Sequence, residues 1–423
     1  MSNPTEIPAI SMDRILTARQ LALRIALGGL VGSLILMFWE GSGQLLRSYL
    51  ASFIYVFGFG LGGLVLLMIQ HITGGAWGYA IRRILEGAAG TMWVLGLLFL
   101  PILLGFTDFT GMIGEKHLLS GPDPEAHPVI RLYHWAEPGV TDHDPVLAFK
   151  SVYLNPPFWI LRSAIAFGIW IALAQVLISL SNKEDKEPSA KARASLREWM
   201  LSISAPGILL FAITILFIST DWAQSIEPHW SSTMYPVIFG FSDLLSALAF
   251  AIIVLVHLYD VKPLDKVVSR NHLRDLGSLM LGFVIFWTYI SFSQFLLIWS
   301  ANLKEEVPYY VARTTGGWEL VTMLLGLGHF LFPFLILLFR ETKRRKEIVW
   351  KIAVFILAMR FVDIFWQVAG GFHGGHLAIH LLDFSTLALL GGAWVYAFLG
   401  ILSSRPMLPL RDEREGDSPI YGV

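Results

Sequence analysis

Residues 68–86 read MIQHITGGAWGYAIRRILE, and this stretch decides what kind of fold the chain adopts. A long apolar run ends at Gln70 and His71, and a glycine-rich segment follows it. Arg82, Arg83 and Glu86 then lead into a second apolar run. Glycine permits tight reversals of the backbone, and paired basic residues favour the cytoplasmic side of a membrane. The pattern predicts two antiparallel transmembrane helices joined by a cytoplasmic elbow at 71–84.

The composition of the chain supports a membrane protein. Of its 423 residues, 55% are hydrophobic and 15% are charged, whereas about 25% of a soluble domain is charged. The apolar residues come in blocks of roughly 20, the length that crosses a bilayer as a helix. Such blocks are too long for barrel strands, and lipid offers no partner to open backbone groups. The sequence therefore predicts an all-α integral membrane protein.

We predict ten transmembrane helices, at 20–39, 48–70, 85–105, 157–180, 198–219, 234–259, 275–299, 317–340, 348–368 and 378–402. Spans two and six both end in histidine, and a basic connection and an acid follow each of them. Spans five and nine also end in similar residues. This weak repeat predicts two four-helix bundles, with spans one and ten as flanking helices.

The predicted division of the chain follows from these spans. It comprises a cytoplasmic N-terminal segment 1–19, flanking helix 20–47, first bundle 48–233, second bundle 234–369, flanking helix 370–402 and cytoplasmic tail 403–423. The first bundle contains a long extracytoplasmic loop, 106–156, which is rich in acids and prolines. Loops of this length are usually functional, so it is either a docking surface for an extracytoplasmic protein or an ordinary solvated loop.

The distribution of charge predicts the orientation of the chain. Most of the 31 Lys and Arg residues lie at the two termini and in alternate connections, which places both termini in the cytoplasm. The first twenty residues show no cleavable signal pattern. The net charge of −1 suggests no nucleic-acid partner. The chain has no cysteine, which excludes disulfides, iron–sulfur ligation and thiolate chemistry within it.

Ionisable residues inside the predicted spans are the candidate functional residues, because burying them in a membrane is costly. Arg360 and Asp363 are three residues apart and share a helix face. They form either a structural ion pair or part of a proton path. Asp243, Glu319 and His329 lie at staggered depths, as a proton relay requires.

The histidines suggest further interpretations. His71 and His257 are expected near the inner interface. They are interfacial side chains, the entrance of a proton path or quinone contacts. They are also the one pair matched in depth for a haem, although a haem there is not favoured. His373, His376 and His380 cluster beside span ten, but their spacing is a poor match to a metal site. We therefore predict no metal or redox cofactor in this chain, and no catalytic residue is identified.

Four stretches carry a resemblance to a known family. They are QHITGGAWGYAIRRILE at 70–86, FSQFLLIWSANLKEEVPYYVARTTGGW at 292–318, HFLFPFLILLFRETKR at 329–344 and MRFVDIFWQV at 359–368. With these, the chain resembles the smaller ten-helix membrane subunit, the F subunit, of bacterial alternative complex III. The wider group is the polysulfide-reductase membrane-subunit (NrfD-like) family.

The resemblance implies a place in a respiratory quinol:cytochrome c oxidoreductase complex in the bacterial cytoplasmic membrane. Partner subunits would be a homologous larger membrane subunit, an iron–sulfur subunit and c-type haem subunits, which carry the electrons from quinol. This subunit would bind no redox cofactor and would contribute structure and a proton path. The residues that would line this path are Asp243, Glu319, His329, Arg360 and Asp363 on the outer side and His71, Glu86, His257 and Asp275 on the inner side.

Two rival functions remain open. A stand-alone secondary transporter would explain ten spans and buried charges, and it predicts broken helices around a central substrate site. The modest candidates for such breaks are 58–63 in span two and Pro206 in span five. A purely structural anchor for extrinsic subunits is the other rival. It predicts that neutralising Asp363 or His329 leaves turnover unchanged.

Overall fold

The fold is a bundle of long helices. The computed structural model describes residues 9–107, 109, 131–261, 264, 268–373, 375–406 and 408. In this part of the chain the regular secondary structure is helical, and it contains no strand. Nine of its helices are long and apolar enough to cross a membrane. The protein is therefore an all-α, multi-pass membrane protein, as the sequence predicts.

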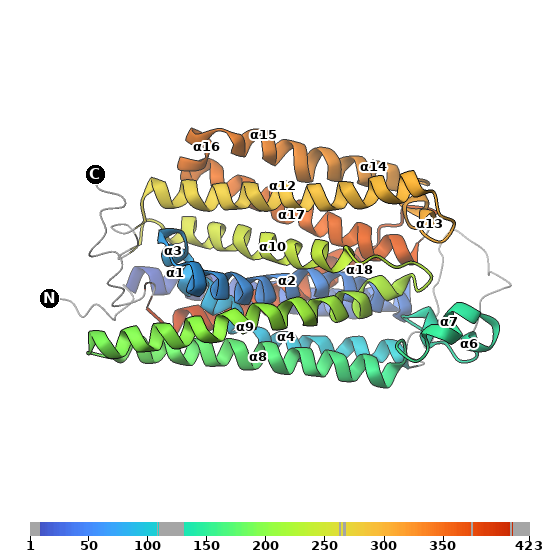
Figure 1. Ribbon diagram of the computed structural model, residues 1–423, viewed down its shortest axis with the longest axis horizontal. Helices are drawn as coiled ribbons and strands as arrows, with labels where there is room; N and C mark the ends of the chain where they lie inside the picture. The colour runs from blue at the N-terminus through green and yellow to red at the C-terminus, as the bar shows by residue number, and fades with distance from the viewer. Residues whose placement is uncertain are drawn as a thin grey trace.

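Eight long helices lie nearly parallel along the longest axis of the molecule (Figure 1). They are α1 (Ala9–Glu40), α2 (Ser42–Thr73), α8 (Pro156–Lys186), α9 (Ala190–Trp222), α10 (Tyr235–Leu258), α12 (Arg270–Ala301), α17 (Lys346–Phe372) and α18 (Leu381–Ser403). Two further spans are each built from three pieces. These are α3 (Ala76–Ala89), α4 (Met92–Phe99) and η1 (Leu100–Phe106), and then α14 (Trp318–Leu324), η4 (Leu325–Leu331) and α15 (Phe332–Leu338).

The reversal between spans two and three is shorter than the predicted elbow. Gly74 and Gly75 both have positive φ, at 65° and 91°, and α3 begins directly after them. Arg82 and Arg83 therefore lie inside α3 and are buried, instead of standing in an exposed connection. They are buried because acids on α3 and α8 pair with them.

Helix α2 forms the centre of the molecule. It packs against α3, α9, α10, α17 and α18, and its apolar part is the most deeply buried among the nine helices counted above. Gly58 and Gly62 face α10, and a side chain at Gly62 would collide with the backbone of Asp243. Small residues four apart let two helices approach closely. The glycines of α2 thus permit a tight crossing with α10.

The irregular helix segments lie elsewhere than the sequence suggested. Helix α2 runs unbroken through 58–63, and α9 runs unbroken through Pro206. Span eight instead contains seven residues of π-helix, η4, between α14 and α15. The ninth predicted span, 348–368, lies within α17, a 27-residue helix that packs against α10 and α2. Helix α17 is not among the nine helices counted above.

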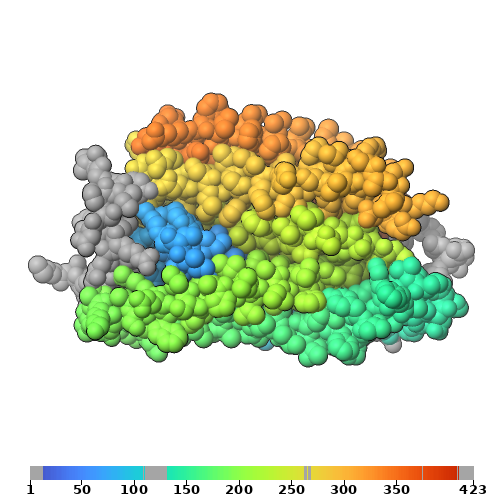
Figure 2. Space-filling model, viewed as in Figure 1, coloured from blue at the N-terminus to red at the C-terminus, as the bar shows by residue number. Residues whose placement is uncertain are grey.

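The connections separate to the two ends of the bundle. The start of α3, the turn between α8 and α9, and α16 (Arg340–Arg344) lie at one end, and α6 (Val140–His143), α7 (Pro145–Lys150) and α13 (Val307–Ala312) lie at the other (Figure 1). On the face drawn in Figure 2, side chains of the long helices cover the surface between the two ends. Two 3₁₀ turns, η2 (His134–Ala136) and η3 (Gln224–Ile226), complete the second end.

Parts of five predicted segments lie outside the described residues. They are 1–8 of the N-terminal segment, 108 and 110–130 of the loop 106–156, 262–263 and 265–267 of the second bundle, 374 of the flanking helix 370–402, and 407 and 409–423 of the tail.

Candidate functional site

The candidate site is built on one face of α17. Arg360, Asp363 and Gln367 are spaced at three and four residues, so their side chains share this face. All three are buried, Arg360 and Asp363 to within 1% of full burial. Arg360 Nη1 forms an ion pair with Asp363 Oδ2. The predicted pair is therefore present within the bundle.

Helix α10 contributes a second carboxylate to this pair. Asp243 is 2% exposed and interacts electrostatically with Arg360. Arg360 Nε donates a hydrogen bond to Ser246 Oγ, one turn further along α10, at 3.4 Å. Gly58 of α2 leaves room for the Asp243 carboxylate, since an added Cβ would lie 2.7 Å from its Oδ1. The tight crossing of α2 and α10 thus fixes Asp243 beside Arg360.

His329 completes the buried group from the irregular span. It is fully buried in η4, and its ring centroid lies 4.2 Å from that of Trp287 on α12. His329 also interacts electrostatically with Arg360. The neighbouring Gly328 lies against Met359 of α17 without space for a side chain. π-Helical turns occur frequently at functional sites, and this one places a buried histidine near Arg360.

We name Asp243, His329, Arg360 and Asp363 the buried charge cluster. The cluster contains one guanidinium and two carboxylates. When one carboxylate carries a proton and His329 is neutral, the net charge of the cluster is zero. A low-dielectric surrounding favours such a balanced state over a net charge. The arrangement can therefore hold a proton on one of its carboxylates.

An aromatic cavity of about 590 Å³ borders this cluster. It lies among α10, α12, α13, span eight and α17, and Asp363 and Gln367 form part of its wall. Its other walls are mainly apolar and aromatic, including Trp287, Tyr309 and Trp366. Cavities of a few hundred Å³ with few polar groups are typical of small-molecule sites. The buried charge cluster therefore has a binding-sized space beside it.

Arg313 holds the cavity wall together at the end of the bundle where α13 lies. Its fully buried guanidinium pairs with Glu227 at 2.5 Å and donates to the backbone carbonyls of Gln367 and Trp366 at 2.9 and 3.2 Å. It also lies 3.7 Å above the ring of Tyr309. Arg313 thus joins η3, α13 and α17 and fixes the backbone that carries Gln367.

Glu319 lies apart from the cluster. It is exposed at the start of α14, and its Oε2 accepts a hydrogen bond from the backbone N–H of Gly317 at 2.8 Å. The carboxylate closes the turn that begins its own helix. The structure therefore brings together four of the five outer residues that the resemblance implies.

The inner residues Glu86, Asp275, His71 and His257 occupy separate environments. Glu86 lies in an ion network, described next. Asp275 pairs with Arg274 at 2.8 Å. His257 is exposed, with Nδ1 2.8 Å from the carbonyl of Ile253, and His71 is buried at the end of α2. Their role in a common path stays a prediction.

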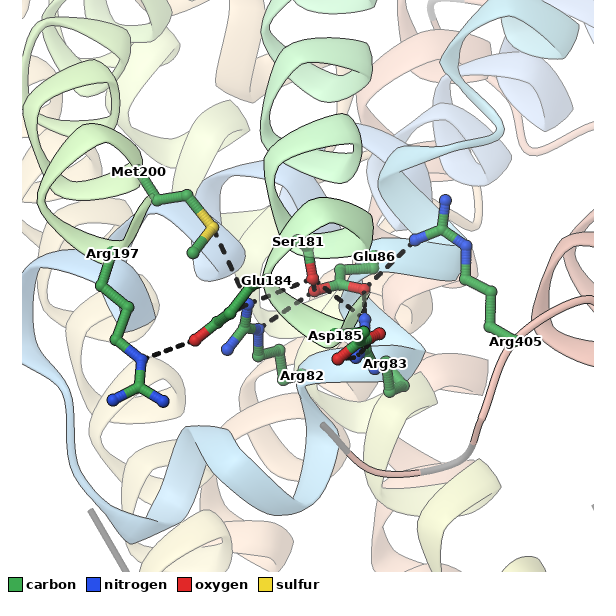
Figure 3. A network of polar contacts seen from close by, with 9 residues as sticks. All are labelled: Arg82, Arg83, Glu86, Ser181, Glu184, Asp185, Arg197, Met200 and Arg405. Atoms are coloured by element: carbon green, nitrogen blue, oxygen red, sulfur yellow. Dashed lines mark hydrogen bonds and ion pairs between the residues drawn. The ribbon is translucent and has the colours of Figure 1, made fainter. Parts of the chain in front are cut away.

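Glu86 lies at the centre of a buried ion network (Figure 3). It accepts hydrogen bonds from Arg82, Arg83 and Arg405 at 3.0, 2.6 and 3.2 Å, and from Ser181 at 2.7 Å. Arg82 also binds Glu184, and Arg83 binds Asp185. Arg197 of α9 binds Glu184 as well. The network joins α3, α8, α9 and the segment after α18.

Some of these residues were not singled out from the sequence. Arg313 and Arg405 appeared only as basic residues of connections, and Trp287 as one of many aromatic residues in spans. Asp383 was also missed; it is 5% exposed on α18 and accepts a hydrogen bond from Ser48 at 2.5 Å. An acid in the first turn of a predicted span was the available signal for Asp383. The burial of Arg313 had no comparable signal.

His373 and His380 lie beside each other, and His373 also contacts a polar side chain. The rings of His373 and His380 lie 5.3 Å apart, and His373 Nε2 lies 3.2 Å from Gln44 Oε1. Burial, followed by Arg47, His380 and His376, lowers the pKa of His373 to about 4. Among the described residues, no group of three or more His, Cys, Asp or Glu side chains is placed to hold a metal ion.

No protein-family model matches this chain, and no curated protein matches its sequence.

Proposed function

We propose that this chain is a membrane subunit of a bacterial respiratory quinol:cytochrome c oxidoreductase complex of the alternative complex III type, in which it conducts protons. The observation that carries the proposal is the buried charge cluster beside the aromatic cavity. Three of the four stretches with the family resemblance, 292–318, 329–344 and 359–368, contribute residues to this cluster or cavity. The resemblance and the unusual burial of charge therefore meet in one region.

The proposed orientation has both termini in the cytoplasm. The basic segments around α3, the α8–α9 turn and α16 lie at one end of the bundle (Figure 1). Lys and Arg favour the cytoplasmic side, so this end is the proposed cytoplasmic end. The remaining loop 106–156 is then extracytoplasmic and is the proposed docking surface for the iron–sulfur and c-type haem subunits.

The charge cluster is the proposed proton-transfer element. Asp363 accepts and releases the proton, while Arg360 holds the cluster near neutrality through the exchange. Asp243 and His329 are the adjacent groups that can receive the proton. The chain itself holds no redox cofactor in this proposal, because the partner subunits carry the electrons.

The variant Asp363→Asn tests this role. We expect proton uptake per electron in proteoliposomes to fall by about tenfold, since an amide cannot exchange the proton. Asp260→Asn is the control, because Asp260 is exposed and pairs with Lys346 at the surface. Unchanged proton uptake in Asp363→Asn, with the complex intact, would leave the purely structural anchor as the better explanation.

A secondary transporter is the second candidate, and the π-helical interruption of span eight favours it. Carriers bind substrate where helices are interrupted near buried charges. This candidate requires that the chain functions without partner subunits. Purification of the chain as a folded, partner-free protein would support it.

A further inference from the structure

We propose that a basic pocket at the end of the bundle where α16 lies binds the phosphate headgroup of an anionic phospholipid. The pocket has a volume of about 580 Å³ and lies among the end of α10, the start of α12, α16 and the start of α17. It shares no described wall residue with the aromatic cavity or the buried charge cluster. The inference does not rest on the proposed respiratory role.

The wall of the basic pocket has a net positive charge. It contains four basic side chains and two acidic ones, which are Arg270, Arg344, Arg345, Lys346, Glu341 and Glu347. A net positive wall favours a headgroup with a net negative charge over a zwitterionic headgroup, in which an ammonium cancels the phosphate. A volume of this size also accommodates a small polar head.

Two guanidinium groups of the wall are free to bind an anion. Arg270 and Arg345 are exposed, and neither forms a hydrogen bond or an ion pair within the part of the chain that the structure describes. Guanidinium groups match the oxygens of a phosphate with paired N–H donors. A phosphate in the pocket therefore gains two charged partners that no protein acid occupies.

The other two basic side chains are held in weak pairs. Arg344 lies 3.6 Å from Glu341, which is 71% exposed. Lys346 pairs at 2.8 Å with Asp260, which lies outside the wall and is 72% exposed. Exposed pairs contribute little stability. Both side chains can therefore turn towards a bound phosphate at small cost.

The backbone on either side of α16 shapes the pocket. Phe339 and Arg345 flank this helix with extended backbone, at ψ of 127° and 112°, so the chain bends before and after it. The bends place α16 and the start of α17 against the start of α12 (Figure 1). Tyr259 and Leu273 supply the uncharged part of the wall. Segments distant in sequence thus converge on one space, which the preference of basic residues for the cytoplasmic side does not by itself require.

The pocket lies at the level where lipid headgroups are expected. Leu335, Leu338 and Phe339 are 49%, 56% and 66% exposed at the end of span eight, and the basic helix α16 begins at the next residue. A change from exposed apolar to basic residues marks the boundary between hydrocarbon and headgroups, where tyrosine is also enriched. Acyl chains can lie against this apolar surface while the phosphate occupies the pocket. The surface favours a lipid over a free phosphate ion.

Native mass spectrometry tests the site on the full chain, delipidated in detergent together with any subunits that purify with it. The probe is phosphatidylglycerol, compared with phosphatidylcholine that has the same acyl chains. We expect the first phosphatidylglycerol to bind about tenfold more tightly than phosphatidylcholine. Phosphatidylglycerol should also raise the unfolding temperature, since it binds the folded chain.

Two matched double variants locate the binding. Arg270→Gln with Arg345→Gln removes the two free guanidinium groups and should weaken phosphatidylglycerol binding about tenfold. Arg14→Gln with Lys191→Gln should change it less than about twofold. These two residues are exposed near the starts of α1 and α9, at the same end of the bundle and outside the pocket wall. The unfolding temperature without lipid shows whether each double variant is folded.

Three results would overturn the proposal. They are equal affinity for the two lipids, equal effects of the two double variants, and displacement of the lipid by an equal concentration of inorganic phosphate. The second would leave only a general attraction of this end of the bundle for anionic lipid, and the third would assign the pocket to a free anion. None of these results depends on which subunits accompany the chain, so failure here is distinct from failure of the respiratory role.

Discussion

Arg360 and Asp363 form an ion pair within α17, with side chains only 1% and 2% exposed. Their burial makes the pair sensitive to removal of either partner. Asp363→Leu removes the ion-pair partner of the buried Arg360 guanidinium, which then faces Asp243 alone, and should destabilise the protein by about 3–5 kcal/mol. The double variant Arg360→Met with Asp363→Leu should recover a large part of this loss, since it removes both charges.

Thermal unfolding in detergent compares the stability of these two variants with that of the parent chain. A double variant that is less stable than Asp363→Leu would mean that Arg360 has a separate structural role, for example through Ser246.

The inner ion network should be a main source of stability at its end of the bundle. Glu86→Gln removes the charge that Arg82, Arg83 and Arg405 share, and should cost about 3 kcal/mol or more. The control is Lys346→Ala. It removes a pair in which Asp260 is 72% exposed, and it should cost less than about 1 kcal/mol.

Limited proteolysis of the α8–α9 turn provides a local measurement of the same effect. Equal proteolysis rates in Glu86→Gln and the parent chain would contradict a role for the network in joining α3 to α8.

Much of the fold follows from the sequence, because long apolar runs must be helical in lipid. The positions of irregular segments do not follow. Pro206 lies in a continuous helix, whereas the π-helix around His329 contains no proline. Pro333, two residues after this turn, lacks the N–H that would bond the carbonyl of His329. The contacts of His329 with Trp287 and of Gly328 with Met359 join residues that are distant in sequence.

The candidate site could be predicted where an ionisable residue interrupts an apolar run of the sequence. Arg360, Asp363, Asp243 and His329 carried that signal. Arg313 did not, because it stands in a polar connection and is buried by contacts with Glu227, Tyr309 and the end of α17. Burial of a connection depends on tertiary packing, which the local sequence pattern does not encode.

The contact between α1 and α18 depends on Gly29. A side chain there would collide with the backbone of Leu389, whereas Gly28 has open space. Because the chain has no cysteine, Ser33→Cys with Ser385→Cys, whose hydroxyls lie 3.0 Å apart, should form a disulfide on mild oxidation.

Adding Gly29→Ala should sharply lower the yield of this disulfide, and adding Gly28→Ala should not. Gel mobility of the protein after partial proteolysis between the helices measures the yield. Equal yields in the two glycine variants would show that the close approach is dispensable.

His373 predicts a dependence of stability on pH. Its pKa is about 4 in the folded chain and about 6.5 when unfolded, so between these values the unfolded chain binds more protons. The stability contribution is full above pH 6.5 and is lost as the pH falls towards 4. The charged or titratable neighbours are Arg47, His376 and His380.

His373→Gln should flatten this dependence, since a glutamine does not titrate. Unfolding temperatures in detergent between about pH 7.5 and pH 4.5 provide the measurement. The same slope in the variant and the parent chain would assign the dependence to other groups.

The most direct test of the proposed respiratory role is purification through a tag on this chain in a gentle detergent. Subunit mass spectrometry and a redox-difference spectrum identify what accompanies it. We predict c-type haem and iron–sulfur subunits together with a larger homologous membrane subunit. A folded, colourless chain that purifies alone would contradict the proposal and favour a transporter.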